Sequence, residues 1–96
     1  MTRTVVVGKA NDRQKEIYDI VLEAQEACLR NLRAGLTGKE ADAYARDVIR
    51  AAGYAERFGH GTGHSVGLEI HEDPRLSQRD ETVLRPGMVV TVEPGI

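Results

Sequence analysis

The sequence contains two adjacent helical segments with a very short connection, and this pairing constrains the fold more than any other feature. Apolar residues recur at helical spacing from residue 17 to 32 and again from residue 41 to 52. Gly35 is expected to end the first helix and Gly53 the second. Because only the segment from Leu36 to Gly38 separates them, we expect two antiparallel helices packed side by side.

Local capping signals mark where both helices begin. Asn11 or Asp12 can cap the first helix, with Gln14 available to bond back, and Thr37 with Glu40 forms a capping box for the second. The inner face of the first helix is expected to contain Ile17, Ile20, Val21, Ala24 and Cys28, and Leu22, Leu29 and Leu32 would widen it. The inner face of the second helix is expected to contain Ala41, Ala45, Val48, Ile49 and Ala52. The wider stripe predicts that the first helix is buried on more than one side.

Three short strands are predicted around the helices. Residues 2–8 are rich in β-branched side chains and end in a glycine turn, and residues 68–72 alternate with period two. A turn at residues 84–87 leads into a third strand at residues 88–93. The polar residues 73–81 are expected to form a loop. The sequence therefore predicts one α+β domain that spans residues 1–96.

Composition excludes two classes of partner. The 13 Lys and Arg residues nearly balance 15 Asp and Glu, and no basic cluster suited to nucleic acid appears. The longest strongly apolar run, Val5 to Val7, is far shorter than the ~20 residues of a membrane-spanning helix. The single cysteine, Cys28, occupies an apolar helical position and is expected to be a packed thiol. We expect a cytoplasmic protein that binds neither nucleic acid nor membrane.

All three histidines, His60, His64 and His71, lie in one stretch that also contains Glu69 and Glu72. Glycines stand at positions 59, 61, 63 and 67 of this stretch. They allow backbone angles that could bring the imidazoles into a shared cleft. Neutral imidazole is a ligand for Mn, Fe, Co or Zn and can also donate to a carbonyl or oxyanion. The alternative is that these histidines are ordinary polar residues of a loop.

Other chemistries fit this stretch less well. No lysine follows the glycines as in a phosphate-binding loop, and one cysteine cannot supply a zinc finger. Ser65 has no surrounding nucleophile-elbow pattern, so a serine triad ranks low. Glu93 ends the predicted strand 88–93, where Pro94 forces a turn. Its carboxylate is therefore a candidate metal ligand or general base, the alternative being a solvated charge.

Two blocks of the sequence resemble the pita-bread metallopeptidase family. They are residues 60–72 (HGTGHSVGLEIHE) and residues 84–96 (LRPGMVVTVEPGI). The segments around Thr2 to Thr4 and Asp42 to Arg46 resemble the same family, so the similarity spans the chain. Within a family that includes creatinase and methionine aminopeptidase, the match is closest to the Xaa-Pro dipeptidase (prolidase) and aminopeptidase P branch.

The resemblance implies a role for each candidate residue. The family's catalytic domain holds two divalent metals, commonly Mn, Co or Zn, through two Asp, one His and two Glu. By motif position His64 would be the histidine ligand, and Glu93 would be the first glutamate ligand and the proton shuttle. His60 and His71 would contact the scissile peptide and its oxyanion without binding metal.

The resemblance also implies an incomplete site and an incomplete fold. Of the five ligands only His64 and Glu93 are matched, because both aspartates and the last glutamate are absent. The chain resembles mainly the second half of the pita-bread domain, with two antiparallel helices on a small antiparallel sheet. We expect a fragment or engineered half of a Xaa-Pro peptidase that is inactive alone and binds no metal or binds it weakly. The alternative is a self-associating half-domain, whose partner would be a second copy instead of the missing half.

Overall fold

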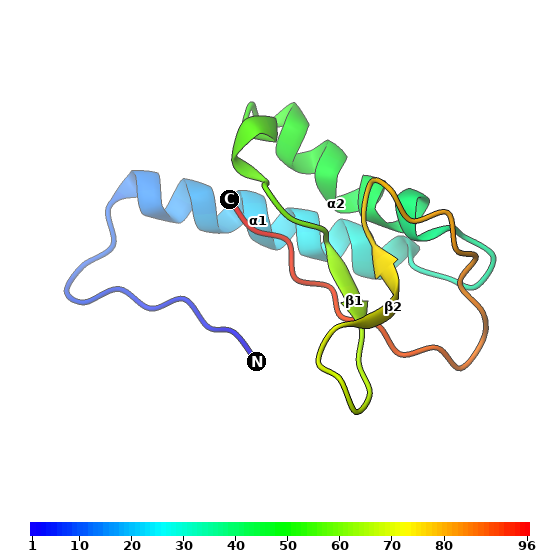
Figure 1. The fold of residues 1–96 in the computed structure, drawn as a ribbon. Coiled ribbons are helices and arrows are strands. Elements are labelled where there is room, and N and C mark those ends of the chain that lie inside the picture. Colours follow the sequence, from blue (N-terminus) through cyan, green and yellow to red (C-terminus); the bar gives the residue numbers. More distant parts are fainter.

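The computed structural model describes all of residues 1–96 and consists of a helix pair with a small sheet beside it. The elements are α1 (Asp12–Asn31), α2 (Gly38–Ala51), the 3-10 turn η1 (Ala55–Arg57), β1 (Gly63–Ser65) and β2 (Glu72–Leu76). The two helices run in opposite directions, and the β1–β2 hairpin lies along one side of them (Figure 1). This confirms the predicted α+β class, with antiparallel helices on an antiparallel sheet.

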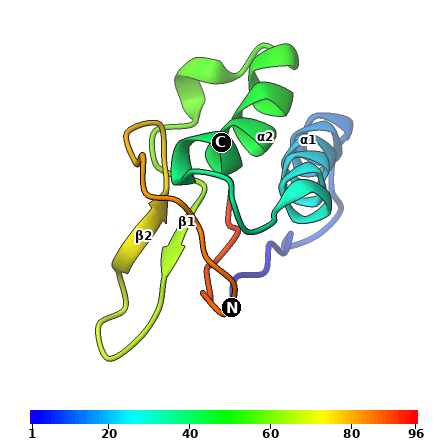
Figure 2. The same ribbon diagram turned by 90° about the vertical axis from the view of Figure 1, so that its right-hand side faces the viewer.

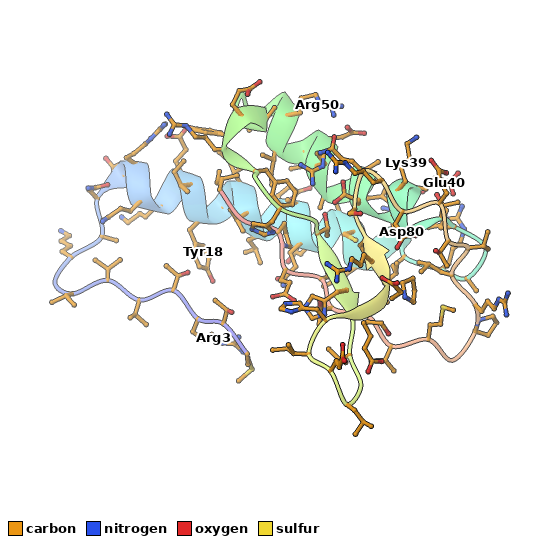
Figure 3. The ribbon with its side chains drawn as sticks, in the orientation of Figure 1. Arg3, Tyr18, Lys39, Glu40, Arg50 and Asp80 are labelled. Carbon is orange, nitrogen blue, oxygen red and sulfur yellow. The ribbon has the colours of Figure 1, made fainter.

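Both helices begin at the predicted caps. Asn11 caps α1: its side chain accepts from the Gln14 amide at 2.8 Å, and its own amide donates to the Gln14 side chain at 2.9 Å. Thr37 caps α2 in the same reciprocal way with Glu40, at 3.1 and 2.7 Å. Figure 3 shows Glu40 at the exposed start of α2. Each capping box satisfies backbone donors that the first helical turn leaves without partners.

Leu22 and Leu29 do not extend the buried face of the first helix, which corrects that part of the expectation. Ala24 and Cys28 are fully buried against α2, whereas Leu22 and Leu29 are 40% and 56% exposed. No other element covers the outer side of α1, so its additional leucines stay in contact with solvent. The helix also ends at Asn31, earlier than expected, and Gly35 instead forms a positive-φ turn in the connection.

Small side chains bring the two helices close together. Ala41, Ala45 and Ile49 of α2 are fully buried, as predicted, while Ala52 is exposed just beyond the end of the helix. The core consists of Ala24, Cys28, Ala41, Ala45, Ile49, Phe58, Leu76 and Leu84. It joins both helices to β2 and to the segment after η1. Neither helix is both long enough and apolar enough to span a bilayer.

Residues 2–7 do not form the predicted strand. Val5 and Val7 are 83% and 102% exposed, and no backbone hydrogen bond involves this segment. β-branched residues favour a strand only where a neighbouring strand supplies hydrogen bonds, and none lies beside this segment. The turn that follows is present, because Gly8 has a φ of 92°.

The hairpin uses different residues from those predicted. The expected strand at residues 68–72 lies in the connecting turn, where Leu68 and Ile70 are 107% and 73% exposed. The strand that pairs with β1 is β2, which begins at the end of that segment and extends into the predicted loop. Its register places His64 opposite Arg75, and an irregularity follows between His64 and Ser65. Period-two alternation alone was therefore misleading here, because pairing with β1 decides which residues are extended.

Residues 88–93 are extended but form only one isolated bridge, between Val90 and Ser65. The predicted turn before them is present: Gly87 has a φ of 86°, and the Met88 amide bonds to the Arg85 carbonyl. Figures 1 and 2 both show this C-terminal segment between β1 and α1. It therefore lies beside β1 on the side away from β2.

Candidate active site

Backbone hydrogen bonds bring His64 and Glu93 together. The Thr91 amide donates to the His64 carbonyl at 2.8 Å, and the Glu93 amide donates to the Thr62 carbonyl at 2.7 Å. The His64 amide in turn donates to the Thr91 hydroxyl at 3.1 Å. As a result, His64 Nε2 lies 3.0 Å from Glu93 Oε1.

The His64 ring is held in one orientation. Its Nδ1 lies 2.9 Å from the Ser65 carbonyl oxygen, which can only accept a hydrogen bond. Nδ1 therefore carries a proton, and Nε2 is the nitrogen that faces Glu93. The His64 side chain is only 15% exposed, whereas that of Glu93 is 50% exposed. A backbone acceptor thus fixes the ring so that Nε2 faces the Glu93 carboxylate.

The other two histidines lie at the same site. His71 packs edge-on against His64, with ring centroids 4.5 Å apart. His60 Nδ1 lies 2.8 Å from the Gly61 carbonyl oxygen, so its Nε2 is also left free. The His60 ring packs edge-on against Phe58 at 5.1 Å. Both His60 and His71 are exposed, and each presents an imidazole beside the His64 and Glu93 pair.

One open cavity of about 390 Å³ contains all four predicted site residues. Its lining consists of His60, Gly61, Gly63, His64, His71, Arg75, Ser77 and Glu93. Sequence reasoning missed Arg75 and Ser77, because it assigned both to a loop. The signal that finds Arg75 is its register position opposite His64, which only the strand pairing reveals. Glu69 and Glu72, noted near the histidines, are absent from the lining.

The charges around Glu93 favour its ionised form. The hydrogen bond from the Thr91 side chain, followed by the nearby His64 and His60 rings, holds the pKa of Glu93 below its usual value, although burial opposes this effect. A carboxylate that stays ionised can accept a hydrogen bond or bind a cation. No side-chain polar atom buried in the chain lacks a hydrogen-bond partner.

His64 and Glu93 have the chemistry of metal ligands, because an imidazole nitrogen and a carboxylate oxygen both bind divalent ions. Their Nε2 and Oε1 atoms lie 3.0 Å apart, which is also an ordinary hydrogen-bond separation. No group of three or more His, Cys, Asp or Glu side chains in the chain is arranged to hold a metal ion. Within the chain, His64 and Glu93 are thus two candidate donors.

Comparison with known proteins identifies the family. The model of metallopeptidase family M24 matches residues 1–96. The Xaa-Pro dipeptidase of Pyrococcus horikoshii is 59% identical over 96 residues, which are 100% of this chain and 27% of that protein. The chain thus spans about a quarter of the length of the relatives that it matches.

Solved structures agree with the sequence relatives. The Xaa-Pro dipeptidase from Bacillus anthracis has a TM-score of 0.93 at 61% identity, covering 96% of this chain and 26% of that one. The prolidase from Pyrococcus furiosus has a TM-score of 0.93 at 56% identity, covering 96% of this chain and 27% of that one. The helix pair and hairpin are therefore part of the pita-bread fold of these prolidases. Because the family model covers every residue, the chain belongs to metallopeptidase family M24.

Proposed function

We propose that this chain supplies the histidine ligand and one glutamate ligand of the divalent metal centre of a Xaa-Pro peptidase. The observation that carries the proposal is the 3.0 Å separation of His64 Nε2 and Glu93 Oε1 in a cavity lined by two more histidines. The family membership supports a metal-dependent hydrolase. The relatives named Xaa-Pro dipeptidase favour a peptide substrate with proline after the scissile bond.

Each residue has a distinct proposed role. His64 and Glu93 bind metal, and Glu93 also holds the proton taken from the attacking water. A divalent metal of the Mn, Co or Zn type would polarise the substrate carbonyl and activate that water. His60 and His71 contact the scissile peptide and its developing oxyanion through their exposed rings.

We also propose that the 96-residue chain alone has no peptidase activity. It brings together two metal donors where the family's dinuclear centre has five, and two donors hold a divalent ion weakly. In this proposal the chain corresponds mainly to the second half of the pita-bread catalytic domain, and the other half supplies the remaining ligands. A cytoplasmic location remains part of the proposal, and the single, free, buried Cys28 favours it.

Isothermal titration with MnCl₂ and ZnCl₂ tests the ligand assignment. The chain is expected to bind either ion weakly, and His64→Ala or Glu93→Gln should abolish the heat. His60→Ala should retain it, because this ring is not a proposed ligand. Equal binding in His64→Ala would overturn the assignment.

A peptidase assay tests the inactivity separately. With Xaa-Pro dipeptides and added Mn²⁺, the chain is expected to produce no free proline. Metal-dependent turnover that disappears in His64→Ala would contradict the proposal, because it would mean that two donors from one chain suffice.

A second candidate function is self-association of this half-domain. Val5, Val7 and Val89 are 83%, 102% and 63% exposed. The extended segment 88–93 is bridged on one side only, and unpaired strand edges with apolar side chains favour association. A homodimer would bring two His64 and two Glu93 residues into one particle, which gives four donors. Sedimentation equilibrium decides this candidate, since a monomer at every concentration would exclude it.

A further inference from the structure

A buried ion pair lies beneath the candidate site. Asp42 and Arg46, one turn apart on α2, are 1% and 6% exposed. Arg46 Nε donates to Asp42 Oδ2 at 2.6 Å, and Nη2 donates to Oδ1 at 3.1 Å. The guanidinium also lies over the Phe58 ring, 4.1 Å from its centre. Removing two charges from water is costly, and a well-packed apolar pair often stabilises a core at least as much as a buried ion pair does. Stability alone is therefore a weak explanation for this pair.

Every further hydrogen bond of the pair goes to the segment that contains His60. Arg46 Nη1 donates to the Phe58 carbonyl at 3.1 Å, and Nη2 donates to the His60 carbonyl at 2.8 Å. Asp42 Oδ1 accepts from the Thr62 amide at 2.9 Å and from the Thr62 hydroxyl at 2.8 Å. The ion pair thus fixes residues 58–62 through four hydrogen bonds to four separate polar atoms of that segment.

Thr62 connects this network to both donors of the candidate metal site. It is fully buried, and its carbonyl accepts the Glu93 amide at 2.7 Å. Its amide and hydroxyl are held by Asp42, and His64 follows two residues later in β1. The same residue therefore sets the position of the Glu93 backbone and the start of the strand that carries His64.

We propose that Asp42 and Arg46 are positioning residues, which act through Thr62 to hold His64 and Glu93, the two proposed metal donors, beside each other. This inference rests on the proposed function of that pair. Neither Asp42 nor Arg46 lines the cavity, so neither contacts a substrate bound there. Second-layer partners of metal ligands typically change metal affinity 10- to 100-fold when altered, because donor positions must be accurate to about half an ångström.

Substitutions at Thr62 give the sharpest test, because Asp42→Asn leaves Arg46 buried without a full charge partner and can unfold the chain. Thr62→Val removes the hydroxyl bond to Asp42 at nearly constant shape, and Thr62→Ser restores the hydroxyl. Thr37→Ala is the matched control, since it weakens the cap of the same helix and Thr37 has no hydrogen bond to residues 58–62. Asp42→Asn is included where its circular dichroism spectrum matches that of the parent chain.

Two measurements on the 96-residue chain are read together. Titration with MnCl₂ and ZnCl₂ should give about a tenfold weaker affinity in Thr62→Val and an unchanged affinity in Thr62→Ser and Thr37→Ala. Amide hydrogen exchange is measured without metal, as the ratio of the rate at Glu93 to the rate at Cys28 in α1. This ratio should be higher in Thr62→Val than in the parent chain. In Thr37→Ala the ratio of these two exchange rates should stay constant.

The outcomes separate this inference from the proposed function. Parent-like affinity in Thr62→Val, with a constant exchange ratio, would overturn the positioning role even if the parent chain binds metal. If the parent chain binds neither ion, the ligand proposal fails, and the exchange ratio still decides whether the network holds Glu93 in place. Faster exchange at Glu93 confined to Thr62→Val and Asp42→Asn supports the inference in either case.

Discussion

Gly63 lies so close to the carbonyl group of Thr91 that a Cβ atom at this position would overlap its oxygen. This contact is what allows β1 and the extended segment 88–93 to approach each other. The Thr91 amide and the His64 carbonyl, 2.8 Å apart, depend on the same approach. A side chain at position 63 would therefore push β1, which carries His64, away from the segment that carries Glu93.

Gly63→Ala is expected to destabilise the chain by about 1–3 kcal/mol, the usual cost of overpacking. Gly59→Ala is the control, because a Cβ at Gly59 would meet nothing within 4 Å and its φ is not in the left-handed region. Urea unfolding followed by circular dichroism measures both variants. Equal stabilities of the two variants would contradict the close approach.

Alkaline pH should destabilise the chain through Cys28. Burial, aided by the nearby Asp42 carboxylate, raises the pKa of the Cys28 thiol from 9.0 to about 11. The unfolded thiol ionises first, so the contribution to stability is complete below pH 9 and is lost as the pH rises towards 11. The loss should be on the order of 2 kcal/mol. Urea unfolding between pH 8 and 11 should show that the free energy of unfolding declines less steeply in Cys28→Ala than in the parent chain. Parallel declines in the two proteins would exclude this explanation.

Acidic pH should weaken the loop around Asp80. Burial acts to raise the pKa of Asp80, but hydrogen bonds from the Thr82 side chain and the Arg75 and Thr82 amides outweigh it and lower the pKa. The Arg75 and Thr82 amides lie 2.6 and 2.8 Å from the carboxylate. Figure 3 shows Asp80 beside the start of α2. Because the folded pKa is depressed, this stability is present above the unfolded pKa and is lost as the pH falls through the folded value.

Asp80→Asn tests that contribution. It is expected to cost about 1 kcal/mol at pH 7 and to reduce the dependence of stability on pH between 5 and 2. Asp19→Asn, an exposed carboxylate of α1 without a hydrogen-bond partner, is the matched control and should retain the parent pH dependence. An identical acid response in both variants would remove Asp80 as a cause.

Loss of the α2 cap should be measurable on its own. Thr37→Ala removes the side-chain acceptor of the Glu40 amide and is expected to cost about 1 kcal/mol. Thr4→Ala, in the exposed segment before α1, should change stability by less than about 0.5 kcal/mol. Thermal unfolding of both variants gives the comparison, and a neutral Thr37→Ala would mean that the cap does not stabilise the helix.

The helices could be predicted because their signals are local. Each capping box involves two residues three positions apart, Asn11 with Gln14 and Thr37 with Glu40, and both are present as expected. The end of α1 and the exposure of Leu29 could not be predicted, because they depend on what covers the helix. A strand depends on its partner in the same way. Residues 2–7 are rich in β-branched side chains and yet have no neighbouring strand.

The candidate site could be predicted in part. His60, His64, His71 and Glu93 were grouped from sequence, and all four line one cavity, although their chemical roles stay predictions. Arg75 was missed because its place depends on register: β2 begins at Glu72, and only then does Arg75 lie opposite His64. Asp42 and Arg46 were noted only as part of a family resemblance. Nothing in their local sequence indicates that Thr62, far along the chain, is the partner of Asp42.

The bonds between Thr62, His64, Thr91 and Glu93 that align the site are made mainly by backbone atoms. Such bonds survive a change of side chain, and His60 and His71 are exposed and add little to the core. Substitutions of His60 and His71 are therefore expected to leave the scaffold intact, unlike substitutions of Gly63. Because backbone hydrogen bonds hold the architecture and exposed side chains carry the chemistry, a descendant protein can lose or exchange its chemistry step by step and keep the same fold.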